Sequence, residues 1–294
     1  MLKIVVPISL LTSILAWSGW LHRLDFLLEP LMGLLGLPAV AALPLLIGVT
    51  ANLDGALAAM APLALSVNQM TLIAIFLVIS HNLIQESVVQ RESGFPFVKA
   101  ALIRLTASVV MVMVVSGLWG DEGAAAQMSH APVLLQLSFW AMIKAWLLDA
   151  LILAAKVLVI IVALMILLEV MRSYHWIDRI VRAMSPVLKL LGLERETGFL
   201  WFTAALFGLS YGAAVIVEET RAGKFSPAEL ERLHLSIGIN HAMVEDPALF
   251  LSLGLAPFWL WVPRFVAAVA AVQMLRLYHC LTRRWHGRRM ADMP

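Results

Sequence analysis

Long apolar runs are the feature that most constrains this sequence. A helix that crosses the hydrocarbon core of a bilayer needs about 20 mostly apolar residues. Uninterrupted runs of that kind cover residues 3–21, 69–89, 95–119, 148–170, 233–255 and 257–280. Hydrophobic residues make up 62% of the chain and charged residues only 14%, against roughly 25% charged residues in a soluble domain. The sequence therefore predicts an all-α polytopic membrane protein and argues against a soluble enzyme, a disordered chain and a nucleic-acid-binding protein.

Two further apolar segments, residues 38–65 and 198–225, are interrupted by polar residues and glycines. An irregular backbone at membrane depth survives only where protein or water surrounds it. Arms of about 11 residues would each rise roughly 16 Å, which is about half of the hydrocarbon core. We therefore expect each segment to form a re-entrant hairpin, with glycines that permit the turns: Gly48, Gly55, Gly208 and Gly212.

The two interrupted segments belong to a weak internal repeat. Residues 30–37 resemble residues 186–193, and glycine and polar positions recur at a spacing of 160: Gly48 and Gly208, Ser66 and Ser226, His81 and His241, Gly94 and Gly254. Coincidence in a sequence rich in Leu, Ala and Gly is the alternative explanation. A true repeat divides the chain into a first half, residues 1–128, and a second half, residues 129–294.

Basic residues set the expected orientation, because cytoplasmic loops are rich in Lys and Arg. Residues 120–136 contain none, whereas residues 172–195 and the C-terminal end are rich in arginine. We therefore expect each half to have three transmembrane helices, one amphipathic helix and one re-entrant hairpin. This arrangement places both termini in the cytoplasm. Three crossings per half make the two repeats inverted, as in many transporters. Eight full crossings with parallel halves would place Arg221, Lys224 and Arg232 outside, against the charge rule.

Ionisable residues inside membrane helices are costly and usually functional. Two clusters of such residues occupy corresponding runs, residues 80–86 and 240–246. Within the apolar run 233–255, the spacing of His234, His241 and Glu245 predicts that the three share one face of a continuous helix. His241 and Glu245 are the pair best suited to bind a metal ion, a hydroxyl group or a coupling proton.

Each of these residues also has a simpler interpretation. The histidines could have a purely structural role, as hydrogen-bond partners of neighbouring helices. Glu86 and Asp246 could lie at helix ends in the headgroup zone. Thr50, Asn52 and Asp54 could cap the arms of a hairpin. Pro247 lacks an N–H and should leave the carbonyl of Met243 free for a ligand.

The segment Gly208-Leu-Ser-Tyr-Gly212, followed by a basic loop and Gly238-Ile-Asn-His-Ala-Met-Val-Glu-Asp246, resembles the nucleoside recognition, or Gate, family of membrane proteins. That family includes the spore maturation A and B proteins and is similar to the gate regions of concentrative nucleoside transporters and of the bacterial ferrous-iron transporter. The resemblance covers residues 198–250 well and residues 40–94 through the repeat. It implies a midplane site enclosed by the hairpins. Unlike those transporters, the chain is expected to have no GTPase domain before its helices and to have less scaffold than a nucleoside transporter.

We therefore expect a multi-pass transporter or permease of the bacterial inner membrane. It is not expected to be an enzyme, because no HExxH, GxSxG or Walker A motif is present. The single cysteine, Cys280, argues against a disulfide, a zinc ribbon and an iron–sulfur cluster. No cofactor is evident. The coupling ion, H⁺ or Na⁺, is left open, as is pairing with a second copy or with another Gate-type protein.

The expected cargo is a small polar, nucleoside-like solute. A divalent metal ion (Fe, Zn or Mn) and a non-transporting partner in a membrane complex are the alternatives. The expected substrate-binding residues are Asn52, Asp54, His81, Asn82, Ser210, Asn240, His241 and Glu245. A carried metal ion would instead bind His81, His241, Glu245 and Asp246.

Overall fold

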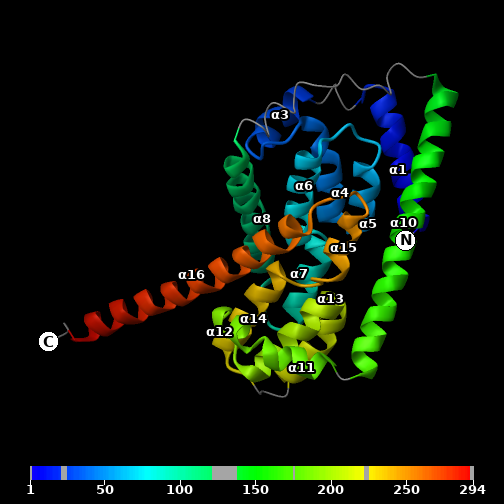
Figure 1. Ribbon diagram of the computed structural model, residues 1–294. Coiled ribbons are helices and arrows are strands. Elements are labelled where there is room, and N and C mark those ends of the chain that lie inside the picture. Colours follow the sequence, from blue (N-terminus) through cyan, green and yellow to red (C-terminus); the bar gives the residue numbers. More distant parts are fainter. Residues whose placement is uncertain (1, 21–24, 121–137, 175, 222–224, 292–294) are drawn as a thin grey trace.

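The computed structural model describes residues 2–20, 25–120, 138–174, 176–221 and 225–291, and its regular structure there is entirely helical (Figure 1). The first half contains α1 (Leu2–Trp17), α3 (Asp25–Gly33), the single-turn helix η1 (Ala39–Ala41), α4 (Ala42–Thr50), α5 (Leu53–Met60), α6 (Val67–Ser80), α7 (Leu83–Glu92) and α8 (Phe97–Trp119). The second half contains α10 (Phe139–Ser173), α11 (Trp176–Ala183), α12 (Ser185–Leu190), α13 (Arg195–Arg221), α14 (Pro227–Ile239), α15 (Glu245–Leu251) and α16 (Pro257–Ala291).

Several helices are suited to a bilayer. Three described segments are long and apolar enough to cross a membrane: Val67–Glu92, Phe97–Trp119 and Pro257–Leu281. Large apolar side chains such as Leu102 on α8 and Leu151 on α10 are exposed on the outside of the bundle, where lipid would cover them. The all-helical class is therefore confirmed, and the apolar helices agree with a membrane location. The loop expected outside, residues 120–136, lies almost wholly outside the described residues.

The interrupted segment 38–65 forms two short helices, α4 and α5, which pack against each other. Asn52 begins α5, and its side chain accepts a hydrogen bond of 2.7 Å from the backbone N–H of Gly55. Gly48 lets α4 lie close to α6, because a Cβ atom there would come within 2.4 Å of Leu77 Cδ2. The expected break is thus present, and an asparagine cap forms its turn.

The segment 198–225 is also interrupted, within α13. Gly208 has φ 79° and ψ 170° inside this helix, a conformation that residues with a Cβ atom rarely adopt. Both expected interruptions therefore exist. That each segment enters and leaves the membrane on the same side stays a prediction.

Two helices that the apolar pattern predicts as continuous are broken. The run 69–89 divides into α6 and α7, and the run 233–255 divides into α14 and α15. Asn82 and Ala242 lie in these breaks with left-handed φ values of 47° and 43°. The prediction of one helix face shared by His234, His241 and Glu245 is therefore wrong, since helix α14 ends before His241.

Both broken helices begin with a capping box, in which a serine and the residue three positions later bond each other's backbone N–H. Ser66 pairs with Gln69 at the start of α6, and Ser226 pairs with Glu229 at the start of α14. Hydrogen bonds from the hydroxyl and the backbone N–H of Ser226 lower the pKa of Glu229 below its ordinary value.

The short helices of the two halves lie at different ends of the bundle. In Figure 1, α3 lies at the top, whereas α11 and α12 lie at the bottom. The first part of α16 packs against α14, α6 and α8, and its C-terminal part projects away from the other helices. The breaks between α6 and α7 and between α14 and α15 lie inside the bundle, where the buried polar residues gather.

Candidate functional site

The two helix breaks are fixed by backbone hydrogen bonds to the interrupted segment of the same half. The N–H of Asn82 donates to the carbonyl of Gly48 at 2.9 Å, and the N–H of Ala242 donates to the carbonyl of Ala204 at 3.1 Å. A left-handed conformation is unfavourable for alanine, so the bond to Ala204 helps to hold it. These bonds set the positions of the residues that precede each break, His81 and His241.

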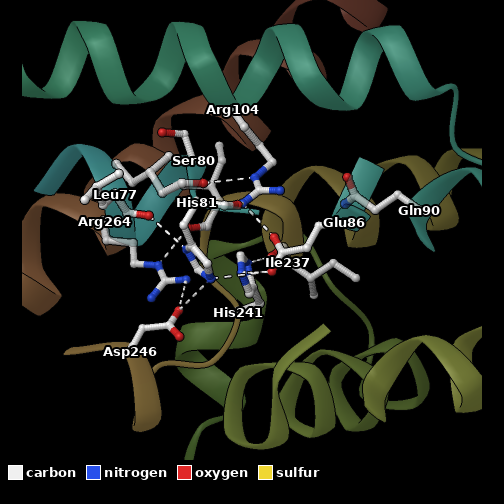
Figure 2. Close-up of polar contacts among 12 residues, drawn as sticks. Leu77, Ser80, His81, Glu86, Gln90, Arg104, Ile237, His241, Asp246 and Arg264 are labelled. Atoms are coloured by element: carbon white, nitrogen blue, oxygen red, sulfur yellow. Dashed lines mark hydrogen bonds and ion pairs between the residues drawn. The ribbon is translucent and has the colours of Figure 1, made fainter. Parts of the chain in front are cut away.

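His81 and His241 face each other in the centre of the site, as Figure 2 shows, with ring centroids 5.2 Å apart. Both rings are buried. The Nδ1 atom of His81 lies 2.8 Å from the carbonyl oxygen of Leu77, and the Nδ1 atom of His241 lies 3.0 Å from that of Ile237. Both rings therefore direct their Nε2 atoms toward the same group of carboxylates.

The carboxylates come from different halves of the chain. Glu86 on α7 has its Oε1 atom 3.0 Å from His241 Nε2 and 3.5 Å from His81 Nε2. Asp246 on α15 has its Oδ2 atom 3.6 Å from His81 Nε2. Each carboxylate thus contacts the histidine of the other half, and both carboxylates are buried.

Two fully buried arginines complete the site (Figure 2). Arg104 on α8 donates from Nε to the carbonyl of Ile79 at 2.9 Å and from Nη2 to the carbonyl of His81 at 2.7 Å, and its Nη2 lies 2.6 Å from Glu86 Oε2. Through these contacts, Arg104 satisfies carbonyls at the end of α6 and also neutralises a carboxylate.

Arg264 on α16 repeats this arrangement in the second half. Its Nε donates to the carbonyl of Ile239 at 2.8 Å, and its Nη2 lies 3.5 Å from Asp246 Oδ2. Sequence reasoning did not single out these arginines as site residues. The available signal was the spacing of 160 residues between Arg104 and Arg264, each inside an apolar run.

The predicted site residues separate into groups. His81, His241 and Asp246 come together, with candidate ligand atoms within 4.8 Å of one another. Asn82 and Asn240 lie in the breaks next to the histidines. Oδ1 of Asn82 and both amide atoms of Asn240 have no hydrogen-bond partner among the described residues.

The remaining predicted site residues do not contact the two histidines in the described part of the structure. Glu245 is exposed, and it interacts electrostatically with Asp54 on α5. Asn52 caps α5, and the hydroxyl of Thr50 donates to the carbonyl of Leu46. The side chain of Ser210 lies outside the described part of the structure. The pairing of His241 with Glu245 is therefore replaced by a pairing of His241 with Glu86.

Two other expectations receive a structural answer. The carbonyl of Met243 is not left for a ligand, because it accepts a hydrogen bond of 2.7 Å from Trp261 Nε1. His234 lies at a contact between the halves. Its ring stacks on Phe95 and its carbonyl accepts a hydrogen bond from Gln90. His234 therefore joins the two halves and is not part of the central site.

Comparison with known proteins gives the family. The profile of the Gate family, described as nucleoside recognition, matches residues 1–118 and 154–254. The chain is 31% identical over 263 residues to the uncharacterized membrane protein YvoD of Bacillus subtilis (strain 168), covering 87% of this chain and 83% of that protein. No solved structure matches the chain. Because the family match spans most of both halves, the chain belongs to the Gate (nucleoside recognition) family of membrane proteins.

Proposed function

We propose that this protein is a membrane transporter for a small polar solute of the nucleoside class. The observation that carries the proposal is a set of buried ionisable side chains where two broken helices meet in an apolar bundle. Transporters bind their substrates at such breaks, because freed backbone groups and helix ends face the substrate there. The site is lined by His81, Glu86, Arg104, His241, Asp246 and Arg264.

The unpaired amides next to the histidines support a polar solute. Asn240 is wholly buried, and neither of its amide atoms has a hydrogen-bond partner among the described residues. Leaving such a group unpaired costs about 1–3 kcal/mol, so its presence favours a role in binding. An asparagine amide both donates and accepts hydrogen bonds, which suits the base edges and ribose hydroxyls of a nucleoside. We infer that Asn82 and Asn240 bind the solute.

The charge balance supports a neutral solute. The two buried arginines offset the two buried carboxylates, Glu86 and Asp246, with Arg104 and Arg264 each lying beside one of them. A nucleoside carries no charge at neutral pH and would not disturb this balance. The family's description, nucleoside recognition, agrees with this class of solute.

The placement of corresponding elements supports an inverted repeat. The interrupted segments, the capping boxes, the left-handed breaks and the buried arginines recur in both halves. Residues 22–35 correspond to residues 175–193 in the predicted repeat, and α3 and the pair α11 and α12 lie at opposite ends of the bundle (Figure 1). Inverted halves can rock against each other around a fixed site, which provides alternating access.

Labelling with an impermeant thiol reagent tests the inverted arrangement. The wild-type cysteine is first replaced, Cys280→Ser, and single cysteines are then placed at the exposed positions Ser18, Glu92 and Pro227. We expect Ser18→Cys to react from outside intact cells, and Glu92→Cys and Pro227→Cys to react only after permeabilisation. Reaction of Pro227→Cys from outside would contradict the re-entrant segment and would favour parallel halves.

Uptake by proteoliposomes tests the proposed cargo. Liposomes that contain the purified protein should accumulate radiolabelled nucleosides faster than liposomes that contain an unrelated membrane protein, and unlabelled nucleoside should compete. Tight binding without accumulation would show recognition but not transport. The absence of both binding and accumulation for purine and pyrimidine nucleosides would contradict the proposal, and would favour a non-transporting partner in a complex.

A further inference from the structure

The hydrogen-bonding direction of the two histidines follows from their neighbours. A backbone carbonyl can only accept a hydrogen bond, so the Nδ1 atoms that contact the carbonyls of Leu77 and Ile237 must carry the ring protons. In a neutral imidazole the other nitrogen is then an acceptor. As neutral rings, His81 and His241 present their Nε2 lone pairs to the centre of the site.

These lone pairs point at other acceptors. His241 Nε2 lies 3.0 Å from Glu86 Oε1, and His81 Nε2 lies 3.5 Å from Glu86 Oε1 and 3.6 Å from Asp246 Oδ2. Ionised carboxylate oxygens only accept hydrogen bonds. The His241 side chain is 1% exposed, so these atoms meet away from solvent. Acceptors that converge in a buried space need either a proton or a metal cation between them.

We propose that His81, His241, Glu86 and Asp246 form a binding site for one divalent transition-metal ion of the Zn²⁺, Mn²⁺ or Fe²⁺ class. Imidazole nitrogens and carboxylate oxygens are the ligands that these ions accept. The ligand atoms of three of these residues already lie within 4.8 Å of one another, and Glu86 Oε1 contacts both histidines. This set differs from the one expected from the sequence, since Glu86 takes the place of Glu245.

The surroundings of the site match those of metal sites. A histidine that binds a metal almost always donates its other ring N–H to a carbonyl or carboxylate, which fixes the ring. The carbonyls of Leu77 and Ile237 accept from His81 and His241 in this way. The carboxylate of Glu86 is held through its other oxygen, Oε2, by Arg104 at 2.6 Å. The ligands are thus oriented by groups that do not themselves bind the ion.

The arginines also limit how tightly an ion can bind. Arg104 and Arg264 each lie beside one of the two ligand carboxylates and already neutralise the charge that would attract a cation. A metal ion therefore binds more weakly than it would to the same ligands without arginines, which suits an ion that must be exchanged. The inference concerns metal binding alone, so it stands whether the ion is cargo or accompanies a solute.

Metal binding to the purified full-length protein tests the inference. After chelation, removal of the chelator, incubation with Zn²⁺ or Mn²⁺ and removal of unbound metal, we expect close to one ion per chain by elemental analysis. His81→Gln and His241→Gln should each weaken binding about 100-fold, because even the loss of a supporting group weakens metal sites about 10- to 100-fold. Glu92→Gln, which removes an exposed carboxylate at the other end of α7, should bind like the wild type.

A second measurement needs no variant. Co²⁺ bound by two imidazoles and two carboxylates in a tetrahedral arrangement should give strong visible absorption, whereas Co²⁺ in water is octahedral and absorbs weakly. Substoichiometric binding by the wild type, equal binding by both histidine variants, or a water-like Co²⁺ spectrum would each overturn the site. If low pH stabilises the protein and no metal binds, protons and not a metal ion lie between the acceptors. That result would also overturn the metal site. All assays omit nucleosides, so failure of nucleoside uptake does not affect them.

Discussion

Replacing Arg104 with methionine should lower the free energy of unfolding by about 3–5 kcal/mol, the cost of leaving a buried charge without its partner. The Arg104 side chain is 0% exposed, and its Nη2 lies 2.6 Å from Glu86 Oε2. It also donates to the carbonyls of Ile79 and His81. Methionine is long enough to fill the space but supplies neither charge nor donor. Glu86 and the end of α6 would therefore lose their partner together.

Denaturation of the purified variants in detergent micelles measures this effect. The double variant with Arg104→Met and Glu86→Met should recover much of the loss, because replacing both members of a buried pair by apolar residues is often nearly neutral. Arg264→Met should cost less than Arg104→Met, since Arg264 bonds one carbonyl and lies 3.5 Å from its carboxylate. Arg91→Met, at an exposed position, should change stability by less than about 0.5 kcal/mol. If Arg104→Met is as stable as the wild type, Glu86 does not depend on Arg104.

The sequence contains the signals for the helices and for two of the breaks. Apolar runs predict the membrane helices, because length and composition alone decide what can cross a bilayer. Gly48 and Gly208 indicate the interruptions in residues 38–65 and 198–225. Gly208 has the positive φ that makes glycine the favoured residue there. These features are local, so a single sequence reveals them.

The breaks in the polar helices could not be predicted in the same way. Ala242 favours helix by its own propensity, yet it takes a left-handed conformation and bonds the carbonyl of Ala204. That bond joins residues far apart in the chain. Helical spacing therefore suggested that His241 and Glu245 share a face, whereas the break separates them.

The contacts of the central site are even harder to predict from local sequence patterns. His241 contacts Glu86, and His81 contacts Asp246, so each histidine depends on the other half of the chain. The recurrence of His81 and His241 correctly drew attention to these histidines, but it could not show which carboxylate each would meet. Arg104 and Arg264 were not expected at the site, although they too recur at a spacing of 160 residues.

Replacing Asn240 with leucine should weaken solute binding without loss of stability. Leucine has a similar size, and neither amide atom of Asn240 has a hydrogen-bond partner among the described residues. Removing a buried unpaired amide should leave the melting temperature unchanged or raise it, since such a group costs about 1–3 kcal/mol. Sites that hydrogen-bond a substrate depend strongly on each bond. We expect nucleoside binding to fall at least about 10-fold, measured by titration of the purified protein.

Asn52 provides the matched control, because its amide has a structural role. Its side chain accepts a hydrogen bond of 2.7 Å from the N–H of Gly55 at the start of α5. Asn52→Ala should therefore destabilise the protein by about 1 kcal/mol, the usual cost of a lost N-cap. An asparagine that binds solute loses affinity but not stability when replaced, whereas a cap loses stability. If Asn240→Leu lowers the melting temperature as much as Asn52→Ala and leaves nucleoside binding intact, then Asn240 is a structural residue and the solute binds elsewhere.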